Sequence, residues 1–222
     1  MTNKVIAVDG TAGSGKSSIC SAVCKKKSWI YINTGALYRA VAYLLTLNKN
    51  TEISNTEIEQ AISDFEKNYI WDESTQYLFY KGQNITAHLN SQSVGNMASS
   101  IAKLPLVRKN LLPIQKNLIK KYKDKIVLVD GRDIATVIAP DAKVKIFMTA
   151  SIKERAKRRL LQLGQKIDLN HLEQEIKDRD VQDSTRKIAP LTKVKEAIEL
   201  DTGSMDFEDC VDTLIKIIEQ NI

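Results

Sequence analysis

Short apolar runs alternate with longer amphipathic stretches along most of the chain, which is the pattern of a buried parallel sheet covered by helices. The apolar runs predict strands at residues 5–8, 29–33, 126–129, 143–149 and 198–202. Apolar residues at helical spacing predict one helix that begins at Lys16 and others at about 36–45, 151–165, 168–182 and 207–218. They also predict a helical region at 91–122, in which Pro105 starts a new segment. This order of elements indicates an α/β fold.

Residues from about 51 to 90 interrupt this rhythm. An acidic helix at about 58–67 is followed by short runs rich in aromatic residues, so small strands and turns are predicted. We interpret the segment as an insertion at the edge of the sheet. Its aromatic residues could stack on bases, but a minor hydrophobic core is the more frequent arrangement for such a group, which comprises Trp71, Tyr77, Phe79 and Tyr80.

A glycine-rich turn joins the first predicted strand to the helix after it, with the sequence KVIAVDGTAGSGKSS at residues 4–18. Glycines have no Cβ, so the backbone here can aim successive N–H groups at an anion. Lys16 can reach the β- and γ-phosphates of a nucleotide, and Ser17 offers a hydroxyl to Mg²⁺. A turn that binds no ligand is the alternative, and the apolar strand before it disfavours that reading. The predicted phosphate-binding loop comprises Gly10, Thr11, Ala12, Gly13, Ser14, Gly15, Lys16, Ser17 and Ser18.

The net charge of +6 could indicate nucleic acid as a partner, but the distribution of the basic residues argues against it. The lysines are scattered, as on a solvated surface, whereas the arginines fall mainly in a few segments. Guanidinium grips phosphate through two parallel hydrogen bonds that lysine cannot copy. Several arginines are therefore expected to face phosphate.

Length and cysteine spacing narrow the class of protein further. The 222 residues suit one α/β domain with an insertion. The three cysteines have no CxxC spacing, which predicts buried, reduced thiols rather than a metal site. The chain has neither an apolar run near the roughly 20 residues that cross a bilayer nor a signal-peptide pattern. A soluble, cytoplasmic protein without a membrane partner is expected.

Charged residues gather where predicted strands end or helices begin. Asp130 follows the strand at 126–129, and a carboxylate in this place can orient Mg²⁺ through water. Arg132 and Asp133 follow at the same edge of the sheet, where open parallel sheets bind ligands. Arg39 is expected in the first turn of its helix, which is unfavourable for a cation unless an anion is also there.

The region from Ser151 to Arg186 resembles a lid that closes over phosphates. Ser151 and Glu154 form a capping box at the start of one helix, and Asp168 caps a second. The alternative is a solvated helical hairpin. The charged residues that favour a lid are Arg155, Arg158, Arg159, Arg179, Asp183 and Arg186.

Six segments together resemble the bacterial cytidylate kinases over nearly the whole chain. They are GTAGSGKSS in the phosphate-binding loop, TGALYRA at 34–40, NMASSIAKLPLVRKNLLPIQ at 96–115, DGRDIATVIAPDAKVKIFMTAS at 130–151, ERAKRRLLQL at 154–163 and RDVQDSTRKIAPL at 179–191. The segments that contain DGRD and R-x-x-A-P-L are far more particular than the loop, which other nucleoside monophosphate kinases share.

The resemblance implies a P-loop three-layer sandwich with a central parallel sheet, an inserted NMP-binding domain and a short helical lid. The core would comprise residues 1–35, 95–150 and 188–222, the insertion about 36–94, and the lid with its arginine-rich helices about 151–187. The implied activity is transfer of the γ-phosphoryl group of ATP to CMP or dCMP, with Mg²⁺, giving CDP or dCDP and ADP. The partners would be these nucleotides and no nucleic acid, and the protein would be a monomer.

The resemblance also implies a role for each matching residue. Cytosine would be read by Ser99, Arg108 and Asp133, the ribose by Arg179 and Asp183, and the monophosphate by Thr34, Arg39, Arg132 and Arg186. Arg155 and Arg159 would close on the phosphates of ATP, and Ser17 and Asp130 would serve Mg²⁺. The catalytic residues would be Lys16, Arg132, Arg159 and Arg186.

Four residues depart from the usual pattern of this family: Thr11 stands in place of proline, Thr34 of serine, Asn90 of arginine and Ala135 of glycine. Thr34 keeps a hydroxyl, and Thr11 alters only the stiffness of the loop. The change at Ala135 leaves the conformation of the local backbone to be determined, and the change at Asn90 leaves the local contacts of the insertion to be determined.

Two other activities remain as alternatives. Another nucleoside monophosphate kinase, with UMP or AMP as acceptor, would share the loop and the lid. A P-loop ATPase or GTPase would need a residue that positions water and a motif that reads the base, and the guanine signature N-K-x-D does not occur in the chain.

Overall fold

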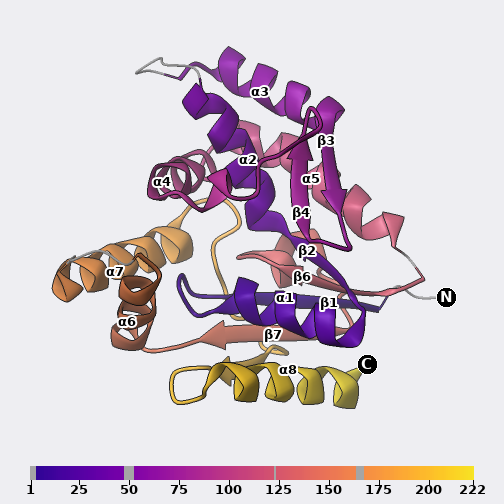
Figure 1. Cartoon of the computed structure of the whole chain (residues 1–222), viewed down its shortest axis with the longest axis vertical. Coiled ribbons are helices and arrows are strands. Elements are labelled where there is room, and N and C mark those ends of the chain that lie inside the picture. Colours follow the sequence, from indigo (N-terminus) through magenta and orange to yellow (C-terminus); the bar gives the residue numbers. More distant parts are fainter. Residues whose placement is uncertain (1–3, 48–52, 123, 164–167) are drawn as a thin grey trace. The chain divides into compact units, whose positions relative to one another are not determined.

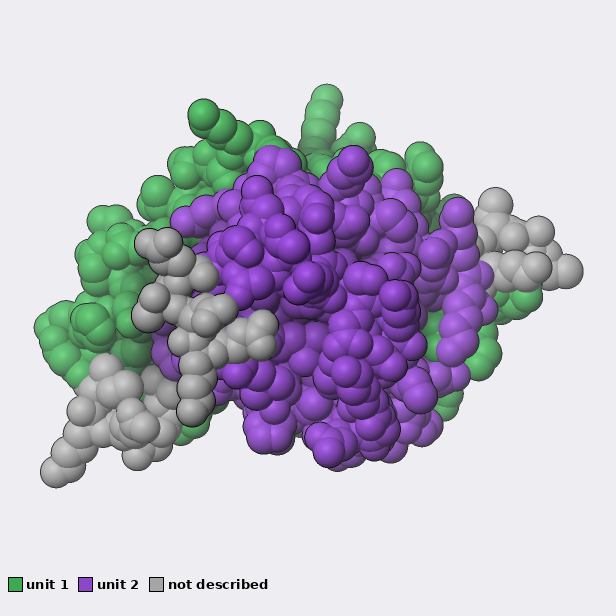
Figure 2. All heavy atoms as spheres, turned by 90° about the horizontal axis from the view of Figure 1, so that it is seen from above, with its two compact units in different colours: residues 1–32, 122–222 green, residues 33–121 purple. Residues whose placement is uncertain are grey.

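The computed structural model describes residues 4–47, 53–122, 124–163 and 168–222. The chain divides into two compact units, which Figure 2 colours separately. The first unit comprises residues 1–32 and 122–222, and the second comprises residues 33–121. The second unit thus contains the predicted insertion, about 36–94, together with residues 95–121, which the resemblance assigns to the core.

A five-stranded sheet in the order β2-β6-β1-β7-β8 forms the centre of the first unit (Figure 1). The strands are β1 (Lys4–Gly10), β2 (Ile30–Asn33), β6 (Ile126–Asp130), β7 (Val144–Thr149) and β8 (Ile198–Asp201). β1 pairs in parallel with β6 and β7, and β7 pairs in parallel with β8. Ile6, Ala7 and Val8 of the central strand are fully buried, as in a sheet covered on both faces. The predicted α/β fold with a central parallel sheet is confirmed.

Among its described residues, the first unit also has four helices and a π-helical turn: α1 (Lys16–Lys27), α6 (Ile152–Leu163), α7 (Leu169–Thr185), α8 (Phe207–Asn221) and η2 (Ile134–Ile138). α1 packs against α8, and α6 packs against α7 (Figure 1). Ala156, Leu172 and Ile176 form a small core between α6 and α7. The predicted buried, free thiols are confirmed for all three cysteines, Cys20, Cys24 and Cys210.

The predicted end of one helix in this unit, α7, differs from that observed. α7 continues to Thr185, beyond the expected end at residue 182, so Asp183 lies within the helix and Arg186 is its C-cap. The predicted end of the helix before it, at residues 162–165, falls partly outside the described residues. Within the described ranges, every helix is too short or too polar to span a bilayer.

The second unit combines helices with a small antiparallel sheet in the order β3-β4-β5. Its elements are α2 (Thr34–Leu47), α3 (Asn55–Asn68), β3 (Tyr69–Asp72), β4 (Tyr77–Tyr80), β5 (Gln83–Asn84), η1 (His88–Asn90), α4 (Gln92–Ile101) and α5 (Pro105–Lys121). α2 packs against α3 and α4, and α3 packs against α5. The predicted acidic helix and small strands are therefore present.

One expectation about α2 is wrong. The helix begins at Thr34, because the side chain of Asn33 accepts the N–H of Ala36 at 3.1 Å in the manner of an N-cap. Arg39 consequently lies in the second turn and not in the first. Since the helix dipole acts mainly within the first turn, the electrostatic reason to expect an anion beside Arg39 is lost.

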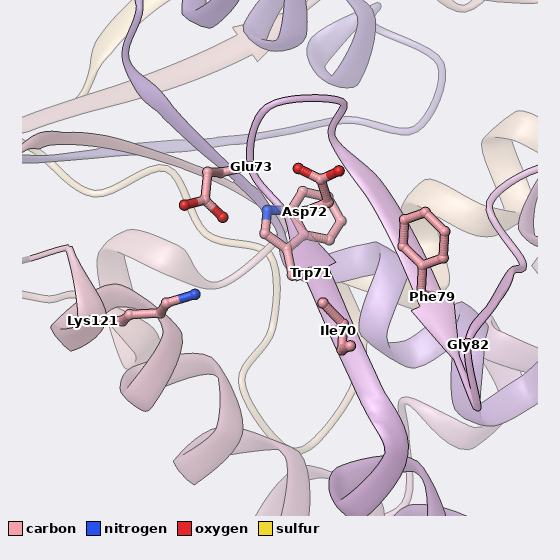
Figure 3. A pocket seen from close by; sticks show the side chains of 7 residues that line it. All are labelled: Ile70, Trp71, Asp72, Glu73, Phe79, Gly82 and Lys121. Carbon is pink, nitrogen blue, oxygen red and sulfur yellow. The ribbon is translucent and has the colours of Figure 1, made fainter.

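The aromatic residues of the small sheet have different environments. Trp71 is 7% exposed and pairs with the fully buried Leu78, so the predicted minor core is confirmed for Trp71. It is wrong for Tyr77, which is 44% exposed. Ile70 and Phe79 pair across β3 and β4 and line an open hollow of about 490 Å³ (Figure 3). None of the residues that line this hollow is a predicted nucleotide contact.

Candidate nucleotide-binding site

The turn between β1 and α1 has the backbone that phosphate binding requires. Gly13 and Gly15 have φ angles of 74° and 83°, in the left-handed region, and Gly15 is the N-cap of α1. Gly10 is required for another reason, because a Cβ there would lie 1.9 Å from the carbonyl oxygen of Met148 on β7. The turn is thus held against the sheet at the N-terminus of α1, a favourable place for an anion.

Lys16 is buried over this turn, with 4% of its surface exposed. Its Nζ donates to the carbonyl oxygens of Gly10 and Thr11, at 2.9 Å each, and to Ser14 Oγ at 3.4 Å. Burial, and next the charge of Arg132, lower the pKa of Lys16 to about 7. A phosphate at the turn would favour the charged ammonium, so the lysine is suited to bind one.

The buried hydroxyl of Thr11 has no hydrogen-bond partner among the described residues. A buried polar group that lacks a partner is costly, and a polar ligand would remove this cost. The loop residues therefore fit a triphosphate.

Two oxygen ligands suited to Mg²⁺ meet where β6 ends. Ser17 Oγ donates to Asp130 Oδ2 at 2.6 Å, and the hydroxyl of Tyr31 on β2 donates to the same oxygen at 3.0 Å. Hard oxygen atoms of this kind fit Mg²⁺, which keeps several waters and takes few protein ligands. Sequence reasoning missed Tyr31, because it lies inside an apolar run that predicts no more than a strand.

Four predicted substrate residues form one cluster of alternating charge in the first unit. Arg132 Nε donates to Asp183 Oδ2 at 3.0 Å. Arg186 Nη2 lies 3.6 Å from Asp133 Oδ1, and Arg186 Nη1 lies 3.9 Å from Asp183 Oδ1. The structure thus brings together residues from the loop after β6 and from the end of α7.

Arg155 joins α6 to the phosphate-binding loop and to α7. Its Nε donates to Ala150 O at 2.9 Å and its Nη1 to Ala12 O at 2.7 Å. Its Nη2 lies 2.6 Å from Asp180 Oδ2, while Asp180 Oδ1 accepts the N–H of Ala12 at 3.2 Å. Sequence reasoning missed Asp180, although it directly follows Arg179. The protein itself thus engages all three guanidinium nitrogens of Arg155, whose contact with ATP stays a prediction.

The other arginines of α6 and α7 have different environments. Arg158, a residue of the predicted lid without an assigned nucleotide contact, donates to Thr202 Oγ1 at 2.9 Å and so joins α6 to the residue after β8. Arg159 and Arg179 are half-buried. Their contacts with nucleotide stay predictions.

The remaining four predicted substrate residues belong to the second unit. Thr34 is buried at the start of α2, and Arg39 Nη1 donates to Leu89 O at 2.7 Å. Ser99 lies on α4. Arg108 on α5 donates to Ala102 O at 3.2 Å, and its guanidinium carbon lies 5.7 Å from the centre of the Tyr38 ring. The residues predicted to contact the acceptor are thus divided between the two units in the chain.

The structure accounts for the alanine at position 135. Ala135 is not among the described residues with positive φ, so its backbone does not require glycine. Its N–H donates to Asp9 Oδ2 at 2.8 Å. Asn90 is exposed at the end of η1.

Comparison with known proteins agrees with this arrangement. The family model described as cytidylate kinase matches residues 6–220. Cytidylate kinases of Bacillus cereus (strain ATCC 10987 / NRS 248) and Bacillus thuringiensis (strain Al Hakam) are each 40% identical over 217 residues, which cover 96% of this chain and 95% of theirs. The fold is similar to that of TT1252 from Thermus thermophilus, with a TM-score of 0.50, 14% identity and coverage of 97% of this chain and 98% of that one. The chain therefore belongs to the cytidylate kinase family.

Proposed function

We propose that this protein transfers the γ-phosphoryl group of ATP to CMP or dCMP, giving ADP and CDP or dCDP. One structural observation supports the proposal in addition to family membership. Within the first unit, Asp180 on α7 accepts a hydrogen bond from the loop that contains the buried Lys16. Asp183 on the same helix pairs with Arg132. A loop for a donor nucleotide and arginines for an acceptor are thus attached to one element, α7.

On the donor side, the loop and Lys16 would hold the phosphates of ATP. Ser17 would ligate Mg²⁺ and Asp130 would orient it through water, and the bound ion would neutralise phosphate charge. Lys16 would exchange its bonds to loop carbonyls for bonds to phosphate oxygens. Such positioned charges stabilise a loose, in-line phosphoryl transfer without help from a covalent intermediate.

On the acceptor side, Arg132 and Arg186 would bind the monophosphate together with Thr34 and Arg39. Asp183 pairs with Arg132, and Asp133 lies beside Arg186, so both arginines are held in place before the substrate arrives. A monophosphate is already largely ionised near neutral pH, since its second pKa is about 6, so no general base is required. Alignment and charge neutralisation supply the catalysis.

Recognition of cytosine is assigned to Ser99, Arg108 and Asp133. A hydroxyl, a guanidinium and a carboxylate can together satisfy the exocyclic amine, the carbonyl and the ring nitrogen of cytosine. Uracil has an acceptor oxygen where cytosine has its amine, so it would leave the carboxylate facing an acceptor.

The test is ADP release from Mg·ATP with CMP, dCMP, UMP, AMP or no acceptor, measured in parallel. Dominant turnover of CMP and dCMP supports the proposal. Preference for UMP or AMP would retain phosphoryl transfer but overturn the assigned cytosine contacts. Hydrolysis that needs no acceptor would replace the kinase by an NTPase.

A further inference from the structure

Asp9, which the proposed mechanism does not use, lies at the carboxyl end of the central strand with 2% of its surface exposed. Both oxygens of its carboxylate are engaged by consecutive backbone groups of another segment. Oδ1 accepts the N–H of Ile134 and Oδ2 accepts the N–H of Ala135, each at 2.8 Å. These two residues begin η2 and directly follow Asp133.

Asp9 accepts the N–H of Ala135, which is one of the first-turn groups that the side chain of an N-cap residue usually accepts. Asp133 is the N-cap of η2, where an aspartate normally accepts a backbone N–H from the first turn with its own side chain. Here the Asp133 side chain makes no such capping bond. Its Oδ1 instead lies 3.6 Å from Arg186 Nη2, in the cluster assigned to the acceptor nucleotide.

Holding this turn with Asp9 requires a carboxylate to be buried, which costs free energy. Burial raises the pKa of Asp9 to about 6, against the opposing effect of the two backbone hydrogen bonds. A buried carboxylate with neutral partners adds little to stability that an apolar side chain could not supply. We therefore expect the position of the backbone that Asp9 holds, at Ile134 and Ala135, to matter for function.

We infer that Asp9 is a positioning residue for recognition of the cytosine base. By capping η2 from β1, it leaves the carboxylate of Asp133 to face the acceptor nucleotide. This inference rests on the proposed function and on the base-reading role assigned to Asp133. Without Asp9, the carboxylate of Asp133 would turn back onto the exposed N–H groups of its own turn.

The substitution Asp9→Asn tests this inference. Asparagine keeps the shape of the side chain but presents an NH₂ group to one of the two N–H donors, so one capping bond is lost. The measurement is the ratio of kcat/KM for CMP to kcat/KM for UMP. The ratio should fall about tenfold, the size expected when one polar contact to a base is misplaced. The KM for CMP should rise while the KM for ATP changes less than about twofold.

Three further variants make the result decisive. Asp133→Asn should lower the same ratio directly. Asp9→Glu keeps the charge but moves it by one methylene, and it serves if the asparagine variant does not fold. Asp206→Asn is the control, because Asp206 also caps a backbone N–H, that of Asp209 at 2.8 Å, but at the start of α8. It should leave the ratio unchanged.

The outcomes separate the two proposals. If Asp133→Asn lowers the ratio and folded Asp9 variants do not, Asp9 has a structural role and the inference is overturned, whereas the proposed function stands. If the Asp9 variants lower only thermal stability, or lower kcat equally for both acceptors, the inference is likewise overturned. A ratio that Asp133→Asn leaves unchanged would overturn the base-reading assignment and the inference with it.

Discussion

Individual charged side chains of the first unit are placed by other charged or polar groups of the protein. Lys16 is held by carbonyl oxygens of the loop, and Arg155 by two carbonyls and Asp180. Arg132 is held by Asp183. Arg132 and Arg155 are thus oriented by the protein itself, whereas Lys16 would exchange its carbonyl bonds for phosphate. Charges that are oriented in advance need little reorganisation, which is the condition for strong electrostatic catalysis.

Replacement of Lys16 by alanine should lower kcat by roughly a hundredfold or more, because a preorganised charge on the transferred phosphoryl group is lost. Thermal stability should hold or increase, since the variant removes a buried cation whose pKa burial lowers to about 7. Steady-state ADP release and a thermal melt measure the two effects. Lys25→Ala, an exposed site on the same helix, is the matched control. A kcat near that of the unmodified protein would contradict the assignment.

Asp9 should give the protein an unusual dependence of stability on pH. Its folded pKa of about 6 exceeds the ordinary value of 3.8, so the folded protein binds this proton more tightly than the unfolded chain. The stabilisation is fully present below the ordinary value and is lost as the pH rises through about 6. The loss amounts to roughly 3 kcal/mol.

Urea unfolding of the unmodified protein and of Asp9→Asn between about pH 4 and pH 7.5 measures this contribution. As the pH rises, the unfolding free energy of the unmodified protein should fall relative to that of Asp9→Asn, because only the unmodified protein loses a proton from Asp9. The other carboxylates titrate in both proteins, so their effects cancel in the difference. Parallel curves would show that Asp9 does not titrate in this range.

At the scale of elements, α7 connects two charged groups of residues in the first unit. One is the pair of Arg155 and Asp180 at the loop before α1, and the other is the cluster that contains Arg132 and Asp183. Asp180 reaches the phosphate-binding loop and Arg155, while Asp183, on the same helix, reaches Arg132. A small apolar core holds α7 to α6. A movement of this helix would therefore affect both groupings at once.

The substitution Asp180→Asn should destabilise the protein by about 1–3 kcal/mol, because it leaves the buried guanidinium of Arg155 opposite a neutral amide. Asparagine can still accept the N–H of Ala12, so the loop itself should persist. Chemical unfolding measures the loss. Asp178→Asn, which alters an exposed bond to Gln174 on the same helix, should cost far less. Equal effects of the two variants would mean that the ion pair with Arg155 contributes nothing.

For the whole molecule, the prediction is a monomer of 24.9 kDa. The large apolar side chains that are exposed belong to separate elements, such as Ile70 on β3, Leu161 on α6 and Phe207 on α8. Stable interfaces between subunits require a large and contiguous apolar area. Sedimentation equilibrium across a range of concentrations is the measurement. A dimer mass that persists on dilution would contradict it.

Patterns in the sequence were sufficient to predict the α/β class, the glycine-rich turn before α1 and nearly all the elements, because these depend on local periodicity and on residues close in the chain. It misplaced the start of α2, since the cap formed by Asn33 competes with the apolar pattern that begins at Ala36. The motifs also indicated which residues to consider for the nucleotides. Their contacts with those nucleotides stay predictions.

The contacts that hold the candidate site residues became visible only in the folded structure. Asp9 caps a turn that begins at Ile134, Tyr31 meets Asp130, and Asp180 binds Ala12. Each bond joins positions far apart in the chain, so no local pattern of hydrophobic and polar residues encodes it. The partner of a buried charge is set by which strands and helices lie next to each other in the folded unit, because a charge removed from water must be satisfied there.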